Sequence, residues 1–312
     1  MPDPGVVLPT VPGVPSRIAI ATFVGITDQF DDDERLAEAL RGRGSEADLI
    51  AWDALGVDWS AFDAVVIRST WDYTDRPEEF LAWVEGVGDR LHNSPALVRW
   101  NSDKRYLQDL EAAGIAVVPT TYVAPGEPLP ALEGEVVIKP SVSAGAKDSG
   151  RFGSAAQDQA RALIERIHRA GRTAMVQPYL ASVDTRGETA IVCLDGTPSH
   201  ALHKGAVLRP DEVAPLRGDG LGVAEVRYDP NLVVAGTADE AELALARAVL
   251  DAVTARFSYV PLYARVDMVE GSGGAPVLME LEAIEPSLYL DQVPGAVDLV
   301  ADAILARVGA EA

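Results

Sequence analysis

Residues 262–284, LYARVDMVEGSGGAPVLMELEAI, contain two runs of alternating apolar and charged residues on either side of the glycine-rich segment GSGG. This pattern is typical of a β-hairpin with a glycine-rich loop. Side chains alternate across a strand, so Arg265 and Asp267 share a face of the first run, and Glu280 and Glu282 share a face of the second. If the loop has about six residues, Asp267 lies opposite Glu280 and Arg265 lies opposite Glu282.

The three carboxylates on this face repel one another, so a neighbouring group must compensate their charge. One arginine cannot neutralise three acids, whereas Mg²⁺ binds carboxylate oxygens together with oxygens of substrate phosphates. The opposite face is predicted to pack on the protein and carries Val266, Met268, Met279 and Leu281. The acids therefore face a cleft or solvent, and the hairpin alone leaves both a metal site and a solvated acidic face open.

The length and charge of the chain limit its organisation and its partners. With 312 residues, it exceeds the usual size of one domain, which predicts two or three subdomains. It has 26 Lys and Arg against 48 Asp and Glu, a net charge of −22, which argues against nucleic acid and anionic membranes as partners. Cys193 lies in an apolar run and is expected to be a small core residue.

The first residues of the chain lack the features of a targeting or membrane segment. Residues 1–16 contain five prolines and have neither the basic start nor the apolar core of a signal peptide. We expect them to form a disordered tail. No apolar run reaches transmembrane length, so the expected location is the cytoplasm.

The segment after this tail predicts an open α/β unit. Strands are expected at 17–23, 48–52 and 64–68, with a helix at 31–43, which gives a β-α-β-β order. No GxGxxG motif follows the first strand and no GxxxxGK[ST] loop occurs in the chain. These absences argue against a Rossmann dinucleotide site and a P-loop nucleotide site.

A cluster of polar residues follows the third expected strand, where ligands bind in open α/β sheets. Arg68 suits a substrate carboxylate and Asp72 suits an ammonium group, so this loop is expected to bind a small zwitterion. Its candidate substrate-binding residues are Arg68, Ser69, Thr70 and Asp72. The alternative is a structural loop in which Asp72 or Thr74 caps the helix that begins near Pro77.

Two lysines are candidates for anion binding in the middle of the chain. Residues 101–103 are expected to start a helix at 104–113, in which the dipole disfavours a cation in the first turn. Lys104 in that turn therefore either binds an anion or is a solvated lysine, and the local sequence leaves both open. Lys139 ends an expected strand at 135–140. The small, glycine-bearing loop 141–153 that follows is predicted to fold over phosphates.

The remaining segments complete the predicted elements. Helices are expected at 158–170, 239–257 and 296–308, and a strand at 174–180 that Pro178 places at a sheet edge or at its own end. A second hairpin is expected from 188–194 and 199–208 around Asp195-Gly196. Residues 209–225 have little pattern and are predicted to form a long lid loop.

In this order, these pieces resemble the ATP-grasp superfamily over residues 17–307. The matching positions are Lys104, Lys139 with the loop after it, Gln177-Pro178-Tyr179-Leu180, Gly187-Glu188, Lys204, Arg265-x-Asp267 and Glu280-x-Glu282. The resemblance implies an α/β (α+β) fold with an N-terminal open α/β domain at 17–98, a small lid subdomain at 99–180 and an antiparallel-sheet subdomain at 181–312. It also favours the metal-site interpretation of the hairpin.

The resemblance further implies a role for each matching residue. ATP phosphates would be bound by Lys104 and Lys139, with Ser143 and Gly145 in the loop above them. Adenine would be held at Gln177, Tyr179 and Leu180, and ribose by Glu188. Two Mg²⁺ ions, with Mn²⁺ as a substitute, would be held by Asp267, Glu280 and Glu282. Charge on the transferred γ-phosphoryl group would be stabilised by Arg265 and Lys204.

Within the superfamily, the segments 68–73, 100–104 and 280–282 look most like a bacterial branch related to glutathione synthetase. This branch includes a ligase that closes O-ureido-D-serine into cycloserine, an antibiotic. The implied reaction converts a carboxylate of a small amino-acid-like substrate into an acyl phosphate, which an amine-type nitrogen attacks. An intermolecular amino-acid ligase and a non-catalytic nucleotide-binding homologue are the alternatives, and a homodimer is left open. The chain departs from the superfamily at one matching position, because Glu282 stands where many superfamily members carry an Asn.

Overall fold

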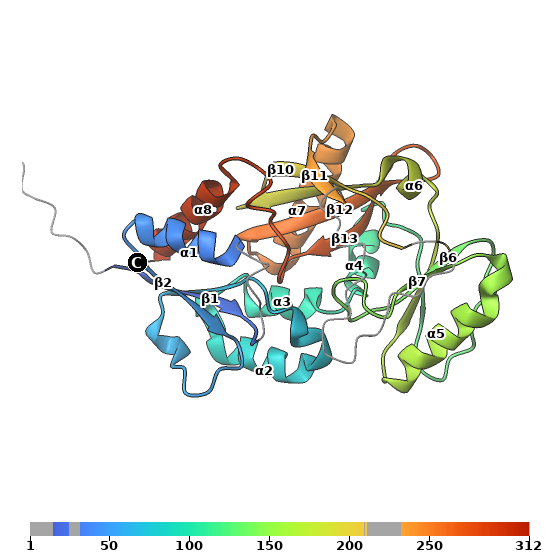
Figure 1. The fold of residues 1–312 in the computed structure, drawn as a ribbon, viewed down its shortest axis with the longest axis horizontal. Coiled ribbons are helices and arrows are strands. Elements are labelled where there is room, and N and C mark those ends of the chain that lie inside the picture. Colours follow the sequence, from blue (N-terminus) through green and yellow to red (C-terminus); the bar gives the residue numbers. More distant parts are fainter. Residues whose placement is uncertain (1–14, 25–31, 209, 211–231, 312) are drawn as a thin grey trace, which may run out of the picture.

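Three β-sheets make up the computed structural model, which describes residues 15–24, 32–208, 210 and 232–311 (Figure 1). Most of the predicted N-terminal tail, and the predicted lid loop 209–225 except for Pro210, lie outside the described residues. The first sheet is parallel, and the other two are antiparallel. The domain boundaries placed at residues 98 and 180 stay predictions.

The N-terminal sheet has the strand order β2-β1-β3-β4. Its elements are β1 (Arg17–Thr22), α1 (Asp32–Gly42), β2 (Glu46–Ala51), β3 (Ala64–Ile67), α2 (Pro77–Val87) and β4 (Leu91–His92). The predicted β-α-β-β order is therefore confirmed, although β2 begins two residues earlier than expected. The two-residue β4 was not predicted, because so short a strand has no readable periodicity.

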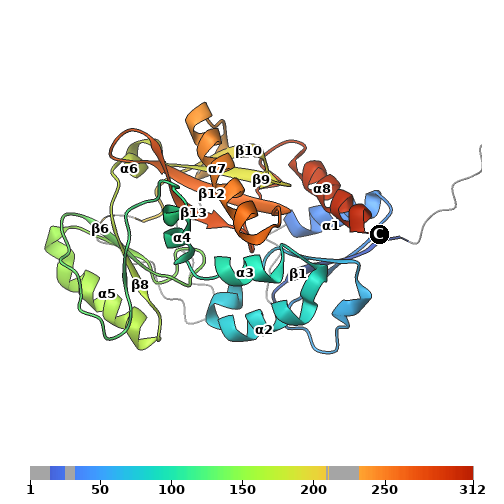
Figure 2. The same ribbon diagram turned by 180° about the vertical axis from the view of Figure 1, so that it is seen from behind.

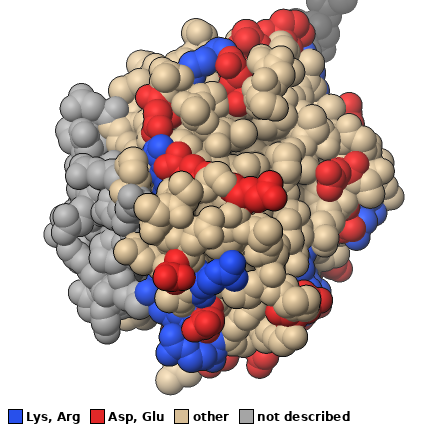
Figure 3. Space-filling model, turned by 90° about the vertical axis from the view of Figure 1, so that its right-hand side faces the viewer, with Lys and Arg blue, Asp and Glu red and all other residues tan. Residues whose placement is uncertain are grey.

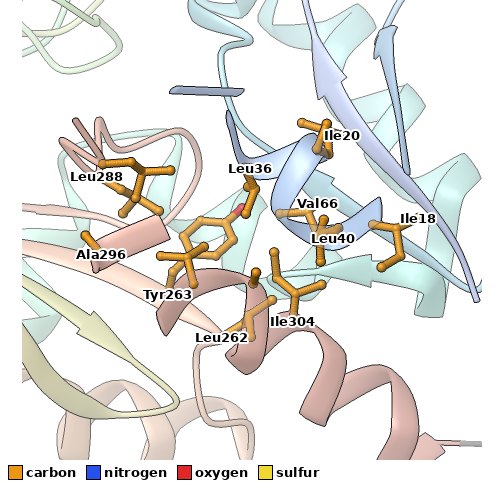
Figure 4. Packing of buried hydrophobic residues seen from close by; sticks show 14 of the residues in the cluster. Ile18, Ile20, Leu36, Leu40, Val66, Leu262, Tyr263, Leu288, Ala296 and Ile304 are labelled. Carbon is orange, nitrogen blue, oxygen red and sulfur yellow. The ribbon is translucent and has the colours of Figure 1, made fainter. Parts of the chain in front are cut away.

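A buried cluster packs the N-terminal sheet against the central sheet (Figure 4). Ile18 and Ile20 of β1 meet Leu36 of α1, and Tyr263 of the central sheet lies beside them. Helix α8 (Ala296–Glu311) covers the same cluster through Ile304 and packs on α1. Each fully buried aliphatic side chain contributes about 1.5–3 kcal/mol, so this cluster fixes the two sheets relative to each other.

The second sheet has the order β5-β8-β6-β7. It consists of β5 (Thr121–Val123), β6 (Val136–Pro140), β7 (Gly150–Phe152) and β8 (Ala174–Pro178), and α5 (Gln157–Arg169) covers it. Pro178 is the last residue of β8, as expected for a proline that cannot donate a ladder hydrogen bond. The prediction of one loop over 141–153 was wrong at its end, because Gly150–Phe152 pair with β6 and bury Phe152.

The third and central sheet has the order β11-β10-β9-β12-β13. Its elements are β9 (Glu188–Leu194), β10 (Thr197–Lys204), β11 (Val233–Gly236), β12 (Tyr263–Glu270) and β13 (Pro276–Glu282). Helix α7 (Glu240–Phe257) lies across one face of this sheet (Figure 2). Cys193 of β9 is buried and its burial raises the thiol pKa to about 12, which confirms a small core residue.

The register of the β12–β13 hairpin confirms the two predicted pairs, since Asp267 lies opposite Glu280 and Arg265 lies opposite Glu282. The register then shifts, and Met268 pairs with Leu278. This bulge adds one residue to β13 and turns the strand. Leu278 therefore packs in the core, whereas Met279, which was expected on the packed face, lines the cavity on the other side.

Two short helices, rather than one, surround Lys104. Helix α3 (Pro95–Asn101) begins with Pro95 after the capping residue Ser94, and α4 (Tyr106–Ala112) begins two residues after Lys104. The prediction that residues 101–103 start a helix was wrong, since Asn101 ends one. Its side chain instead bonds the backbone of β13 and the residue after it, accepting from the Ala283 amide and donating to the Leu281 carbonyl, each at 2.8 Å.

On the face of the molecule that carries α5, acidic and basic side chains are interspersed and form no patch of one charge (Figure 3).

Residues 182–186 form one further short helix, α6 (Ser182–Arg186), beside the central sheet. Among the helices of the described residues, none is long and apolar enough to span a membrane.

Candidate active site

A cavity of about 610 Å³ lies between the second sheet and the central hairpin. Its walls come from the loop after β6, the end of β8, the facing side chains of β9 to β13, and the loop after β3. It collects every residue predicted for nucleotide binding, metal binding or catalysis: Lys104, Lys139, Ser143, Gly145, Gln177, Tyr179, Leu180, Glu188, Lys204, Arg265, Asp267, Glu280 and Glu282. The fold thus brings residues that are more than 100 positions apart in sequence, such as Lys104 and Arg265, into the same cavity.

Each of the three hairpin carboxylates has a basic partner. Asp267 accepts from Arg265 Nε at 2.7 Å and from Lys204 Nζ at 2.8 Å. Arg265 also pairs with Glu282, and Lys104 Nζ lies 3.0 Å from Glu280 Oε1. The expectation that one arginine faces three acids was therefore incomplete, because lysines from other segments supply the rest of the positive charge.

Burial and these ion pairs set the pKa values of the cluster. Burial raises the pKa of the Asp267 carboxyl, but Arg265 and Lys204 outweigh it and hold the pKa well below its usual value. Likewise, Lys104 and Lys139 overcome the effect of burial and lower the pKa of Glu280. Burial lowers the pKa of Lys139, and Glu280 only partly offsets this effect. Lys139 is therefore short of negative charge and suits an anionic ligand.

The carboxylates are turned toward these cations, and no group of three or more His, Cys, Asp or Glu in the described part of the chain is arranged to hold a metal ion. The donor chemistry nevertheless fits Mg²⁺, since Asp267, Glu280 and Glu282 line the same cavity and present carboxylate oxygens. The lysines that now pair with these acids are also the natural partners of phosphate oxygens. The metal assignment stays a prediction.

Lys104 is buried and held in place by the loop after β6. Its ammonium donates to the Ser143 carbonyl at 2.5 Å, and its own carbonyl accepts from the Tyr122 hydroxyl at 3.1 Å. Gly145 in the same loop has φ +65°, a conformation that glycine adopts without strain. The loop therefore lies directly over the Lys104 ammonium group.

The end of β8 forms the wall at which adenine binding was expected. The Gln177 amide donates to Thr120 at 2.8 Å, and the Tyr179 ring lies under Arg151, with 3.5 Å between guanidinium carbon and ring centroid. Apolar side chains suited to a flat ring also line the cavity, namely Val118, Val137, Val183, Met279 and Leu281. Glu188, the expected ribose ligand, pairs with Lys204 at 2.9 Å.

A glycine allows the close approach of two strands at this ion pair. Gly187 has φ +72°, and a Cβ atom there would lie 2.3 Å from the Lys204 carbonyl oxygen. Only glycine accommodates both the positive φ and this contact. The backbone before β9 is thereby held against β10 at the point where Glu188 meets Lys204.

The four residues predicted to bind the substrate, Arg68, Ser69, Thr70 and Asp72, are not among the described residues that line the cavity. Arg68 is buried and pairs with Asp33, at 3.5 Å between Nε and Oδ1, and Ser69 also donates to Asp33. Asp72 accepts from Trp52 Nε1 at 2.9 Å and pairs with Arg76. The loop enters the cavity through other side chains, namely Trp71, Tyr73 and Thr74.

A further acid, Glu285, lies in the cavity wall and was not predicted from the sequence. Burial and the neighbouring Glu282 raise the pKa of the Glu285 carboxyl to about 8. Ser287 and Tyr289 of the same segment also line the cavity. The only signal for these residues was an acid between Ile284 and Pro286, three positions after Glu282, in a segment without strand periodicity.

Solved structures of ligases share this fold over nearly the whole chain. A D-alanine–D-alanine ligase from Bacillus anthracis, complexed with ATP, aligns with a TM-score of 0.64 at 16% identity, covering 94% of this chain and 96% of that chain. A RimK domain ATP-grasp protein from Sphaerobacter thermophilus aligns with a TM-score of 0.63 at 20% identity, covering 92% and 99%. Together these two structures show that the chain has the ATP-grasp fold.

Three comparisons then narrow the family. The model of the D-cycloserine synthetase DcsG N-terminal domain matches residues 18–93. The cycloserine biosynthesis protein DcsG of Streptomyces lavendulae is 41% identical over 271 residues, which cover 82% of this chain and 86% of the relative. The crystal structure of D-cycloserine synthetase DcsG aligns with a TM-score of 0.82 at 36% identity, covering 94% of this chain and 100% of that chain. The chain belongs to the DcsG family of ATP-grasp ligases, in which ATP and Mg²⁺ are used.

Proposed function

We propose that this protein closes O-ureido-D-serine into cycloserine in an ATP-dependent reaction. The observation that carries the proposal is the cavity itself, which holds four basic side chains, Lys104, Lys139, Lys204 and Arg265, against the hairpin carboxylates. The identity of 41% to a cycloserine biosynthesis protein supports the choice of substrate. The basic groups suit both the phosphates of ATP and the carboxylate of an amino acid.

The proposed chemistry has three steps, which are phosphorylation of the carboxylate, formation of one C–N bond, and a hydrolysis. A substrate carboxylate oxygen attacks the γ-phosphorus of ATP, the bond to ADP breaks, and an acyl phosphate forms. The oxygen-bound ureido nitrogen attacks the acyl carbon, the bond to phosphate breaks, and phosphate carries away the nitrogen's proton. The ring nitrogen still bears the carbamoyl group, and one water molecule releases it as carbamate to give cycloserine.

The residues of the cavity would divide this work by position. Lys104 and Lys139 would bind phosphate oxygens, and Arg265 and Lys204 would stabilise the charge on the transferred phosphoryl group. Mg²⁺ bound by Asp267, Glu280 and Glu282 would neutralise phosphate charge. The wall formed by Gln177, Tyr179 and Leu180 would hold adenine, Glu188 would hold ribose, and Ser143 and Gly145 would cover the phosphates.

Several finer expectations belong to the same proposal. Asp267, Glu280 and Glu282 would hold two Mg²⁺ ions, which would neutralise charge on the phosphates, and Mn²⁺ would substitute for them. The enzyme would work in the cytoplasm and would bind no nucleic acid or membrane, in keeping with a net charge of −22.

Phosphate release tests the proposal. O-ureido-D-serine with ATP and Mg²⁺ should release phosphate without a second amino acid, and mass spectrometry should detect cycloserine. Lys139→Met should abolish the reaction, whereas Arg247→Met, on the exposed side of α7, should leave it unchanged. Release that requires a second amino acid would instead establish an intermolecular ligase, and no release with any amino acid would favour a non-catalytic nucleotide-binding protein.

A further inference from the structure

One acid in the cavity wall has no basic partner. Among the acids that line the cavity, Glu188 and Asp267 pair with Lys204, Glu280 pairs with Lys104, and Glu282 pairs with Arg265. Glu285 forms no ion pair within the described residues, although it lines the same cavity. Lys104 acts on Glu285 only from beyond ion-pair distance, and burial together with Glu282 outweighs its effect on the pKa of the carboxyl, so a further positive charge at this position would be favourable.

The backbone that carries Glu285 is fixed from several sides. Four consecutive carbonyl oxygens, those of residues 285–288, each accept a hydrogen bond from a side chain of another segment. In chain order, the donors are Trp71 Nε1 at 3.3 Å, Arg68 Nη1 at 2.9 Å, Arg265 Nη1 at 3.1 Å and His200 Nε2 at 2.9 Å. Such support is typical of a side chain that is held ready for a ligand.

The position of Glu285 separates it from the expected nucleotide wall. Its backbone carbonyl accepts a hydrogen bond from Trp71, in the loop after β3, and Glu285, together with Glu280 and Glu282, raises the pKa of the buried Tyr73 in the same loop, after the larger effect of burial. The adenine wall instead lies at Gln177 and Tyr179, at the end of β8. Glu285 thus lies in the cavity wall between Trp71 and the charged groups Lys104 and Glu282, away from the adenine wall, and this part of the cavity is left for the amino-acid substrate.

We propose that Glu285 binds the α-ammonium group of the amino-acid substrate and so selects α-amino acids over other carboxylates. This inference rests on the proposed ligase function. It gives the substrate two opposite anchors, because its carboxylate would face the basic groups around Arg265 while its ammonium faces Glu285. Holding both ends would orient the carboxylate toward the γ-phosphoryl group.

The test combines an enzyme variant with a substrate variant. Wild type and Glu285→Gln are compared on O-ureido-D-serine and on the same molecule with hydrogen in place of the α-ammonium group. Wild type should lose about tenfold to hundredfold in kcat/KM without the ammonium, the factor expected for a charged hydrogen bond. Glu285→Gln should lose a similar factor on the intact substrate, lose little more on the analogue, and keep the KM for ATP.

A third variant and two contrary outcomes make the result decisive. Glu285→Asp keeps the charge on a shorter side chain, so it should retain part of the preference for the ammonium-bearing substrate, which a merely structural role would not do. A Glu285→Gln enzyme that binds ATP normally and keeps the full wild-type preference overturns the inference. If wild type itself releases no phosphate with O-ureido-D-serine, the proposed function fails instead, and the two failures are thus distinguishable.

Discussion

Asp267 is the residue on which the ion pairs of the cavity converge, because it neutralises both Arg265 and Lys204. Asp267 is only 1% exposed, so Asp267→Asn would remove a buried negative charge that these two cations share. Breaking a buried ion pair from one side typically costs about 3–5 kcal/mol. We therefore expect the ligand-free variant to melt well below the wild type and to show no ATP turnover.

Asp298→Asn provides the matched control for that change. Asp298 also pairs with an arginine, Arg43, at 2.8 Å, but its side chain is 61% exposed. Surface pairs of this kind contribute little, so the melting temperature and phosphate release should stay close to wild type. An Asp267→Asn protein that melts at or above the wild-type temperature would show that repulsion among the acids outweighs the ion pairs.

At the same scale, the sequence predicted the site residues better than their partners. The β-strand period placed Arg265, Asp267, Glu280 and Glu282 on one face, because alternation is a local property of the chain. The pairing of Glu280 with Lys104 joins segments far apart in sequence, and no local pattern indicates it. Glu285 was missed for a similar reason, because only the tertiary fold brings it to the wall of the cavity.

The turn before β9 determines how the elements around Lys204 approach each other. Gly187→Ala would place a Cβ atom 2.3 Å from the Lys204 carbonyl oxygen and would also strain a φ of +72°. Gly134→Ala shares only the second problem, because Gly134 has φ +68° but a Cβ atom there would meet nothing within 4 Å among the described residues. The positive φ alone costs about 1–2 kcal/mol.

We expect Gly187→Ala to lower the melting temperature more than Gly134→Ala and to reduce kcat, because β10 carries Lys204 into the cavity. Gly134→Ala should leave kcat unchanged. Thermal melts and phosphate release on both variants check this. Equal losses in the two proteins would mean that the contact between the turn and β10 is relieved by a small backbone shift and does not position Lys204.

Elements with strong periodicity were predicted well, and short ones were not. Helices α5 and α7 have clear apolar stripes, and α7 begins at the capping box formed by Asp239 and Glu242. The strands β4, β7 and β11 have two to four residues and are held by tertiary pairing rather than by local preference. The break between α3 and α4 also escaped prediction, because the polar residues 101–103 were interpreted as a cap.

At the scale of the whole molecule, a few buried polar contacts join the N-terminal sheet to the segment that follows the central hairpin. Asn93 donates to the carbonyls of Tyr263 and Ala283, each at 2.8 Å, and Arg68 donates to the Pro286 carbonyl at 2.9 Å. In the structure Arg68 ties two parts of the fold together through the Pro286 carbonyl, and its role as a substrate ligand stays a prediction.

Arg68→Ala should therefore act on stability first. It removes the partner of buried Asp33, whose pKa is already raised by burial despite Arg68, and leaves the Pro286 carbonyl without its donor. Loss of one member of a buried pair costs about 3–5 kcal/mol, and most of that cost is the charge left behind on Asp33. The double variant Arg68→Ala/Asp33→Asn should consequently melt higher than Arg68→Ala alone, while the KM for ATP stays near wild type in both. A melting temperature that Arg68→Ala leaves unchanged, together with a large rise in the KM for the amino-acid substrate, would instead return Arg68 to the role of a direct substrate ligand.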